Sequence, residues 1–163
     1  MSTNPYEPPE SEASPERRPP RAPRSPLAAV IAGLAVDIGG SLLVGVVISV
    51  MYAAQLQAQG LSDREMVEAL KAMPPDSGLY MAGLLLGLAL SVAGGYVCAR
   101  VARRDEWKPG LVMAATATLF GLVIDGGAGD QMMLLVTVTS FACNLLGVKF
   151  GADHNRRAEA PSP

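Results

Sequence analysis

Four long apolar segments constrain this chain more than any other feature of its sequence. Residues 27–52, 79–99, 109–124 and 131–148 make up about half of the 163 residues and contain one charged side chain, Asp37. All other Asp, Glu, Lys and Arg residues lie outside them. Amphipathic helices and half-buried strands spread polar residues along their length, so neither would produce this segregation. The sequence therefore excludes an ordinary soluble protein and predicts an all-α integral membrane bundle.

The lengths of the segments predict four transmembrane helices. A hydrocarbon core of about 30 Å needs roughly 20 helical residues, so 27–52 and 79–99 are long enough to cross. The other two fit as 107–125 and 131–149 if Lys108, Asp125 and Lys149 extend to the interfaces. The alternative is a re-entrant pair of helices joined at the glycine-rich stretch 125–130, which would need protein or water to satisfy its backbone.

The distribution of basic residues predicts the orientation. With four spans, all but two of the 13 Lys and Arg residues fall on one side, the exceptions being Arg64 and Lys71. The positive-inside rule then places both termini in the cytoplasm. The anchors expected at this inner interface are the basic and aromatic residues Arg100, Arg103, Arg104 and Trp107.

Three polar pieces flank the spans. Residues 1–26 are rich in proline and charge and nearly free of large apolar residues, so we expect a disordered cytoplasmic tail. Residues 150–163 are expected to form a short second tail. In the outer loop, Ser62 and Glu65 have the spacing of a capping box, and Pro74 stops the helix predicted over 63–73. Its apolar face favours packing on the bundle or the outer leaflet, with gating or partner docking as the functional alternative.

Small residues recur every fourth position in the first two spans. Because lipid tails are as apolar as leucine, membrane helices associate through close backbone approach and interhelical hydrogen bonds, which such rows permit. Packing inside the bundle and an oligomer interface both remain open from the sequence. The residues predicted to pack helices in this way are Gly33, Ser41, Gly45, Gly83, Gly87, Ser91 and Gly95.

Asp37 is the candidate polar site of the membrane domain. It lies about ten residues into the first span, near the bilayer midplane, where an aspartate costs roughly 2.5 to 3.5 kcal/mol. Ser140 and Asn144 on the fourth span lie at a comparable depth and are its expected hydrogen-bond partners. The functional interpretation is an ion or proton site, and the structural alternative is a polar lock between helices.

No catalytic, metal or cofactor site is predicted. Cys98 and Cys143 both fall within spans, and the chain has one histidine. Residues 127–130 match the G-x-G-D string of intramembrane aspartyl proteases in those four residues only, which we attribute to chance. We therefore expect a protein that is not an enzyme and binds no nucleic acid.

One stretch resembles a known group of proteins. Gly94-Gly-Tyr-Val-Cys-Ala-Arg-Val-Ala-Arg103, followed by Lys108-Pro-Gly110, is similar to the end of the second span and the next loop in small bacterial four-helix inner-membrane proteins of unassigned function. Several of those proteins also carry an aspartate in the first span, but the histidine that often precedes the glycine is Pro109 here. The resemblance implies a bacterial inner membrane and no particular mechanism.

These observations lead to two expected functions. The first is a non-enzymatic assembly or accessory component of the lipid bilayer that packs, through small-residue helix faces, against a second copy or another membrane protein. The alternative is a small ion-coupled or proton-coupled transport or channel protein that uses Asp37.

Overall fold

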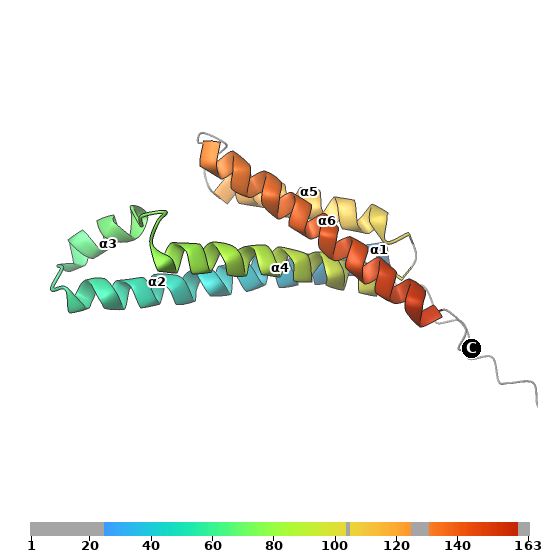
Figure 1. The fold of residues 1–163 in the computed structure, drawn as a ribbon, viewed down its shortest axis with the longest axis horizontal. Coiled ribbons are helices and arrows are strands. Elements are labelled where there is room, and N and C mark those ends of the chain that lie inside the picture. Colours follow the sequence, from blue (N-terminus) through green and yellow to red (C-terminus); the bar gives the residue numbers. More distant parts are fainter. Residues whose placement is uncertain (1–24, 104, 125–130, 160–163) are drawn as a thin grey trace, which may run out of the picture.

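The computed structural model describes residues 25–103, 105–124 and 131–159, and these are helical with no strand among them (Figure 1). The elements are α1 (Pro26–Leu34), the π-helical turn η1 (Ala35–Gly39), α2 (Gly40–Ala58), α3 (Asp63–Lys71), α4 (Gly78–Ala102), α5 (Trp107–Ile124) and α6 (Gln131–Glu159). Four helices are long and apolar enough to cross a membrane. The predicted four-span bundle with one short loop helix is therefore confirmed, and this is a multi-pass membrane protein.

Some sequence predictions fall outside the described residues. They concern residues 1–24 of the disordered tail predicted over 1–26, the interfacial anchor Arg104 and the connection over residues 125–130. Pro26, the last residue of the predicted tail, instead begins α1. The two helices flanking that connection, α5 with 18 residues and α6 with 29, are each long enough to cross by themselves. Their lengths favour full spans over the re-entrant alternative.

The first span is longer than predicted. Elements α1, η1 and α2 form one continuous helix of 33 residues, Pro26–Ala58, which is about 50 Å long at 1.5 Å per residue. It passes the predicted end at residue 52 because the chain stays helical until Gly60, whose φ of 81° ends the helix. Leu56, only 5% exposed, is buried in this extension, where α3 contacts α2.

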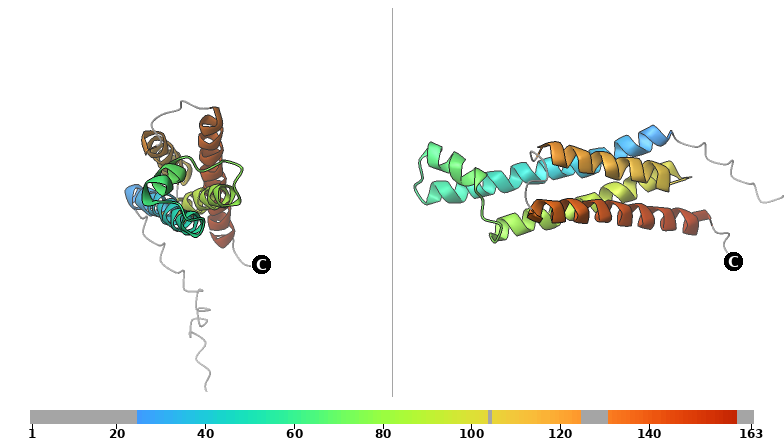
Figure 2. Two further views of the ribbon diagram at one scale, coloured as in Figure 1. Left: turned by 90° about the vertical axis from the view of Figure 1, so that its left-hand side faces the viewer. Right: turned by 90° about the horizontal axis from the view of Figure 1, so that it is seen from above.

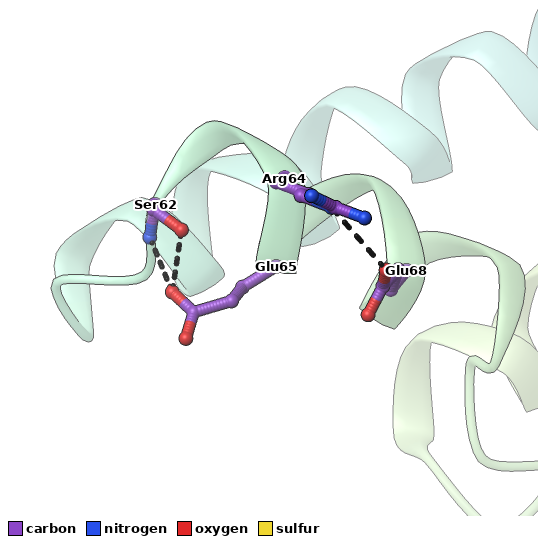
Figure 3. Close-up of polar contacts among 4 residues, drawn as sticks. All are labelled: Ser62, Arg64, Glu65 and Glu68. Carbon is purple, nitrogen blue, oxygen red and sulfur yellow. Dashed lines mark hydrogen bonds and ion pairs between the residues drawn. The ribbon is translucent and has the colours of Figure 1, made fainter.

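Helix α3 confirms the predicted capping box but ends earlier than expected. A carboxylate oxygen of Glu65 accepts hydrogen bonds from the Ser62 backbone N–H at 2.9 Å and the Ser62 hydroxyl at 2.6 Å (Figure 3). These bonds lower the pKa of Glu65. The helix stops at Lys71 rather than residue 73, because the residue before Pro74 is disfavoured in the helical region. Figure 3 also shows Arg64 near Glu68, an exposed pair that contributes little stability.

Helix α6 extends ten residues beyond the predicted end of the fourth span. The helix thus continues to Glu159, through most of the stretch 150–163 that the sequence assigned to a short C-terminal tail. Gly147, Gly151 and Asn155 follow one another every fourth position and are all buried. Because α6 packs against α4 along this row, tertiary contacts hold the polar end of the helix in helical form.

The bundle is tightly packed at one end, which we call the Asn155 end. Here α1 and α5 begin, α4 ends and Asn155 lies on α6. A Cβ on Gly33 would lie 2.8 Å from the Cβ of Cys98, and a Cβ on Gly95 or Gly147 would press on backbone carbonyls of the facing helix. The backbone of α4 therefore lies close to the backbones of both α1 and α6, and only glycine allows an approach this close.

The opposite end, which we call the α3 end, is open. Figure 2 shows that α2, α3 and the start of α4 reach beyond the ends of α5 and α6, and Figure 1 shows the α5–α6 pair diverging from α2 and α4. No atom lies within 4 Å of a Cβ placed on Gly45, Gly87 or Gly121. Glycines therefore meet the backbone of a facing helix in the packed half, whereas in the open half Gly45, Gly87 and Gly121 have free space beside them and Gly83 meets only the side chain of Ile48.

Candidate polar site around Asp37

Asp37 lies inside the bundle, on the π-helical turn of the first span. Its side chain is 5% exposed, and its two carboxylate oxygens accept hydrogen bonds from two different helices. The Ser91 hydroxyl of α4 donates to one oxygen at 2.9 Å, and the Asn144 amide of α6 donates to the other at 3.1 Å. Single-turn π-bulges occur frequently at functional sites, because the extra residue redirects a side chain.

The hydrogen-bond network continues to Ser140 on α6. The hydroxyls of Ser91 and Ser140 lie 3.0 Å apart. Since the one proton of Ser91 is donated to Asp37, Ser140 donates to Ser91. The Asn144 amide group also donates to the backbone carbonyl of Ser140 at 3.3 Å. Three spans thus share one polar layer at the middle of α4.

The Asn144 side chain leaves one polar atom without a partner. Asn144 is 1% exposed, and its carbonyl oxygen Oδ1 has no hydrogen-bond partner in the described part of the chain. A buried acceptor without a partner costs roughly 1 to 3 kcal/mol. Oδ1 of Asn144 is therefore free to accept a hydrogen bond, and rotation of the Asn144 side-chain amide would turn it toward Asp37.

Glycines allow the helices to approach closely at this layer. A Cβ on Gly94 would lie 2.8 Å from the Cβ of Asp37. A Cβ on Gly95 would press on the backbone carbonyl oxygen of Asn144. Because both positions lack a side chain, α4 lies directly against Asp37 on one side and Asn144 on the other. The pair Gly94-Gly95 thus sets the hydrogen-bonding distances of the site.

A cavity of about 360 Å³ opens from this layer toward the α3 end. Asp37, Ser91 and Ser140 form its polar floor, whereas most of its wall is aliphatic. We call it the Asp37 cavity. It is lined by Asp37, Ile38, Ser41, Leu42, Gly83, Leu84, Gly87, Leu88, Ser91, Ala117, Phe120, Gly121, Ile124, Val136 and Ser140.

A second cavity of about 260 Å³ extends this space toward the outer loop. The two share Ser41, Gly83, Leu84 and Gly87, and the second one is also lined by Met73 and Tyr80. Met73 is the last residue of the loop helix predicted over 63–73. In the structure it lies after the end of α3 and borders this second cavity, so the outer loop contacts the space that continues from the Asp37 cavity.

A separate polar cluster lies at the Asn155 end. The Asn155 amide donates to the backbone carbonyl of Ala99 at 3.0 Å and to Glu106 at 3.2 Å, and its oxygen accepts from Arg100 at 3.0 Å. Asn155 is 6% exposed. Nearby, the Tyr96 hydroxyl lies 3.1 Å from Nδ1 of His154. These contacts fasten the end of α6 to α4 and to the loop before α5.

The structure bears differently on the predicted polar-site residues, packing residues and interfacial anchors. Asn144 donates to Asp37 as expected, whereas Ser140 is linked to Asp37 only through Ser91, which was predicted only as a packing residue. Gly33, Gly83 and Gly95 meet neighbouring helices. A Cβ placed on Gly45 or Gly87 would have no atom of another helix within 4 Å, and Ser41 and Gly87 line the Asp37 cavity. Among the predicted anchors, Arg100 contacts Asn155, Arg103 ends α4 with a φ of 57°, and Trp107 is 44% exposed.

Sequence reasoning did not identify Asn155 or the row of small residues on α6 that leads to it. The signal was present, because Cys143, Gly147, Gly151 and Asn155 continue the four-residue period past Lys149, where the span was ended. In the part of the chain that the structure describes, no three His, Cys, Asp or Glu residues are grouped to hold a metal ion. No family model, curated protein or solved structure matches the chain.

Proposed function

We propose that this protein is a non-enzymatic transport component that receives a positively charged solute in the Asp37 cavity. One observation carries the proposal: a buried carboxylate, about a third of the way along the first span, lies at the floor of a cavity that extends toward one end of the bundle. A carboxylate has about four acceptor positions, and Ser91 and Asn144 occupy two of them. Asp37 can therefore receive a cation without losing its internal partners. Ionisable residues inside spans commonly mark substrate or ion pathways.

Asn144 supports coupling to a proton. When Asp37 is ionised, it accepts a hydrogen bond from the Asn144 amide nitrogen. When Asp37 is protonated, rotation of the amide would present the unpartnered Oδ1 to the carboxyl proton. Both protonation states then keep a hydrogen bond to α6. A solute and a proton could therefore exchange at Asp37 without separating the helices.

We also propose that the Asn155 end faces the cytoplasm of a bacterial inner membrane. Basic residues gather at this end, including Arg100, Arg103 and Arg156, whereas Arg64 and Lys71 alone lie in the loop at the α3 end. The resemblance around Gly94-Gly95 supports the bacterial origin. In this orientation the Asp37 cavity opens outward and the packed half closes it toward the cytoplasm.

The test is uptake of labelled cations by reconstituted vesicles, which also detects an electroneutral exchange of one cation for one proton. Proteoliposomes with an acidic interior are diluted into neutral buffer that contains radiolabelled sodium, potassium or phenyltrimethylammonium, and the trapped label is counted. We expect uptake of at least one cation by the wild type and by Asp76→Asn, which changes an exposed carboxylate in the outer loop. Uptake should be absent in Asp37→Asn. Absence of uptake for every cation would contradict the proposal.

The assembly role is the second candidate, and Gly45 favours it. Gly45 is exposed on α2 where it borders the second cavity, and no atom of another helix lies within 4 Å of a Cβ placed on it, so another helix could pack there. If it does, Gly45→Leu should reduce the mass of the purified particle measured by light scattering. Gly39→Leu is the matched control, since Gly39 is equally exposed but lies about 120° away around the same helix.

A further inference from the structure

We infer that the solute bound in the Asp37 cavity is an organic ammonium ion with an apolar substituent. The inference rests on the proposed function and deepens it by naming a substrate class. It follows from three properties of the cavity: its oxygen content, its walls and its size.

The cavity offers few oxygens to a bare metal ion. A metal cation entering a protein site must replace its hydration shell with several oxygen ligands. Ser91 and Asn144 already donate to the two oxygens of Asp37, and the Ser91 hydroxyl also accepts from Ser140. The further hydroxyl in the lining belongs to Ser41. A quaternary ammonium ion needs no coordinating oxygens, only an opposite charge and apolar contact.

The walls of the cavity suit the apolar part of such an ion. Above the polar floor, aliphatic side chains such as Ile38, Leu88 and Val136 line the space, and Phe120 of α5 adds an aromatic ring. Aromatic rings are preferred contacts of quaternary ammonium groups. The volume of about 360 Å³ falls within the roughly 300–1,000 Å³ range of small-molecule sites. One carboxylate in an apolar pocket thus selects a solute with one positive charge and an apolar body.

The test is equilibrium dialysis of the purified full-length chain against radiolabelled phenyltrimethylammonium. Its neutral isostere tert-butylbenzene and radioactive sodium serve as comparison probes. We expect saturable binding of phenyltrimethylammonium that excess tert-butylbenzene does not displace. Asp37→Asn should lower the affinity at least tenfold, Phe120→Leu should lower it roughly threefold to thirtyfold, and Asp76→Asn should leave it unchanged. The probe comparison on the wild type is informative even if Asp37→Asn fails to fold.

The outcomes separate the inference from the proposed function. Binding of sodium that depends on Asp37, without binding of phenyltrimethylammonium, would overturn the ammonium inference and leave a cation site standing. Equal binding of the neutral isostere would show that the cavity does not recognise charge and would overturn the inference. If none of the cations binds, the inference and the proposed function both fail.

Discussion

Replacement of Gly95 by alanine should destabilise the bundle, whereas the same change at Gly87 should not. Both residues lie in the interior of α4, so both variants gain up to about 1 kcal/mol of helix propensity. At Gly95 the new Cβ would press on the backbone carbonyl oxygen of Asn144 and lie 3.0 Å from the backbone nitrogen of Val148. Backbone atoms cannot move aside as a flexible side chain would. Such overpacking costs typically 1 to 3 kcal/mol.

The two variants should therefore differ by about 1 to 3 kcal/mol, or roughly 5- to 150-fold in the unfolding equilibrium. Thiol labelling of Cys98 during SDS titration measures this difference, because Cys98 is fully buried in the fold. The partly exposed Cys143 is first replaced by serine to leave a single thiol. If Gly95→Ala and Gly87→Ala unfold at the same SDS fraction, α4 and α6 do not approach each other as described.

Two further predictions concern the ends of the bundle. Glu65 has a lowered pKa because of its Ser62 hydrogen bonds, so its stabilisation of α3 is present above the ordinary carboxyl pKa and is lost as pH falls through the lowered value. NMR shifts of the α3 amides should therefore move toward coil values at acidic pH, and Glu65→Ala should abolish this dependence. Replacing Asn155 by leucine removes its hydrogen bonds to the Ala99 carbonyl, Glu106 and Arg100, at roughly 0.5 to 1.5 kcal/mol for each bond, and should speed trypsin cleavage after Arg156 severalfold in vesicles that expose this end. Cleavage at the wild-type rate would mean that these bonds do not hold the end of α6.

The span count could be predicted from the sequence because hydrocarbon imposes a strong and local rule. Each crossing segment must satisfy its own backbone and avoid charge, so four apolar runs predict four helices. The capping box was equally predictable, since Ser62 and Glu65 act within one turn. The cluster of Asp37 with Ser140 and Asn144 followed from depth alone, because residues at the same depth on neighbouring spans can meet.

The ends of the helices, and the division of the bundle into a packed half and an open half, were harder to predict from the sequence. Lys149 marks the end of apolar sequence, yet α6 continues because Gly151 and Asn155 pack against α4, which depends on tertiary contacts. Gly87 and Gly95 have the same residue type and lie on the same helix, but only Gly95 meets another backbone. That difference arises from the divergence of α5 and α6 from α4, which no period in the sequence encodes.

If Asp37 receives a cation from the α3 end, water should reach the Asp37 cavity from that end and not from the Asn155 end. A membrane-impermeant maleimide applied to intact cells tests this directly in a chain carrying Gly87→Cys and Cys143→Ser, with buried Cys98 as the internal control. We predict rapid labelling at position 87, slowed by phenyltrimethylammonium, and none at Cys98. If a cysteine at position 87 resists the reagent as Cys98 does, the Asp37 cavity is closed to water, and Asp37 cannot receive a cation from the α3 end.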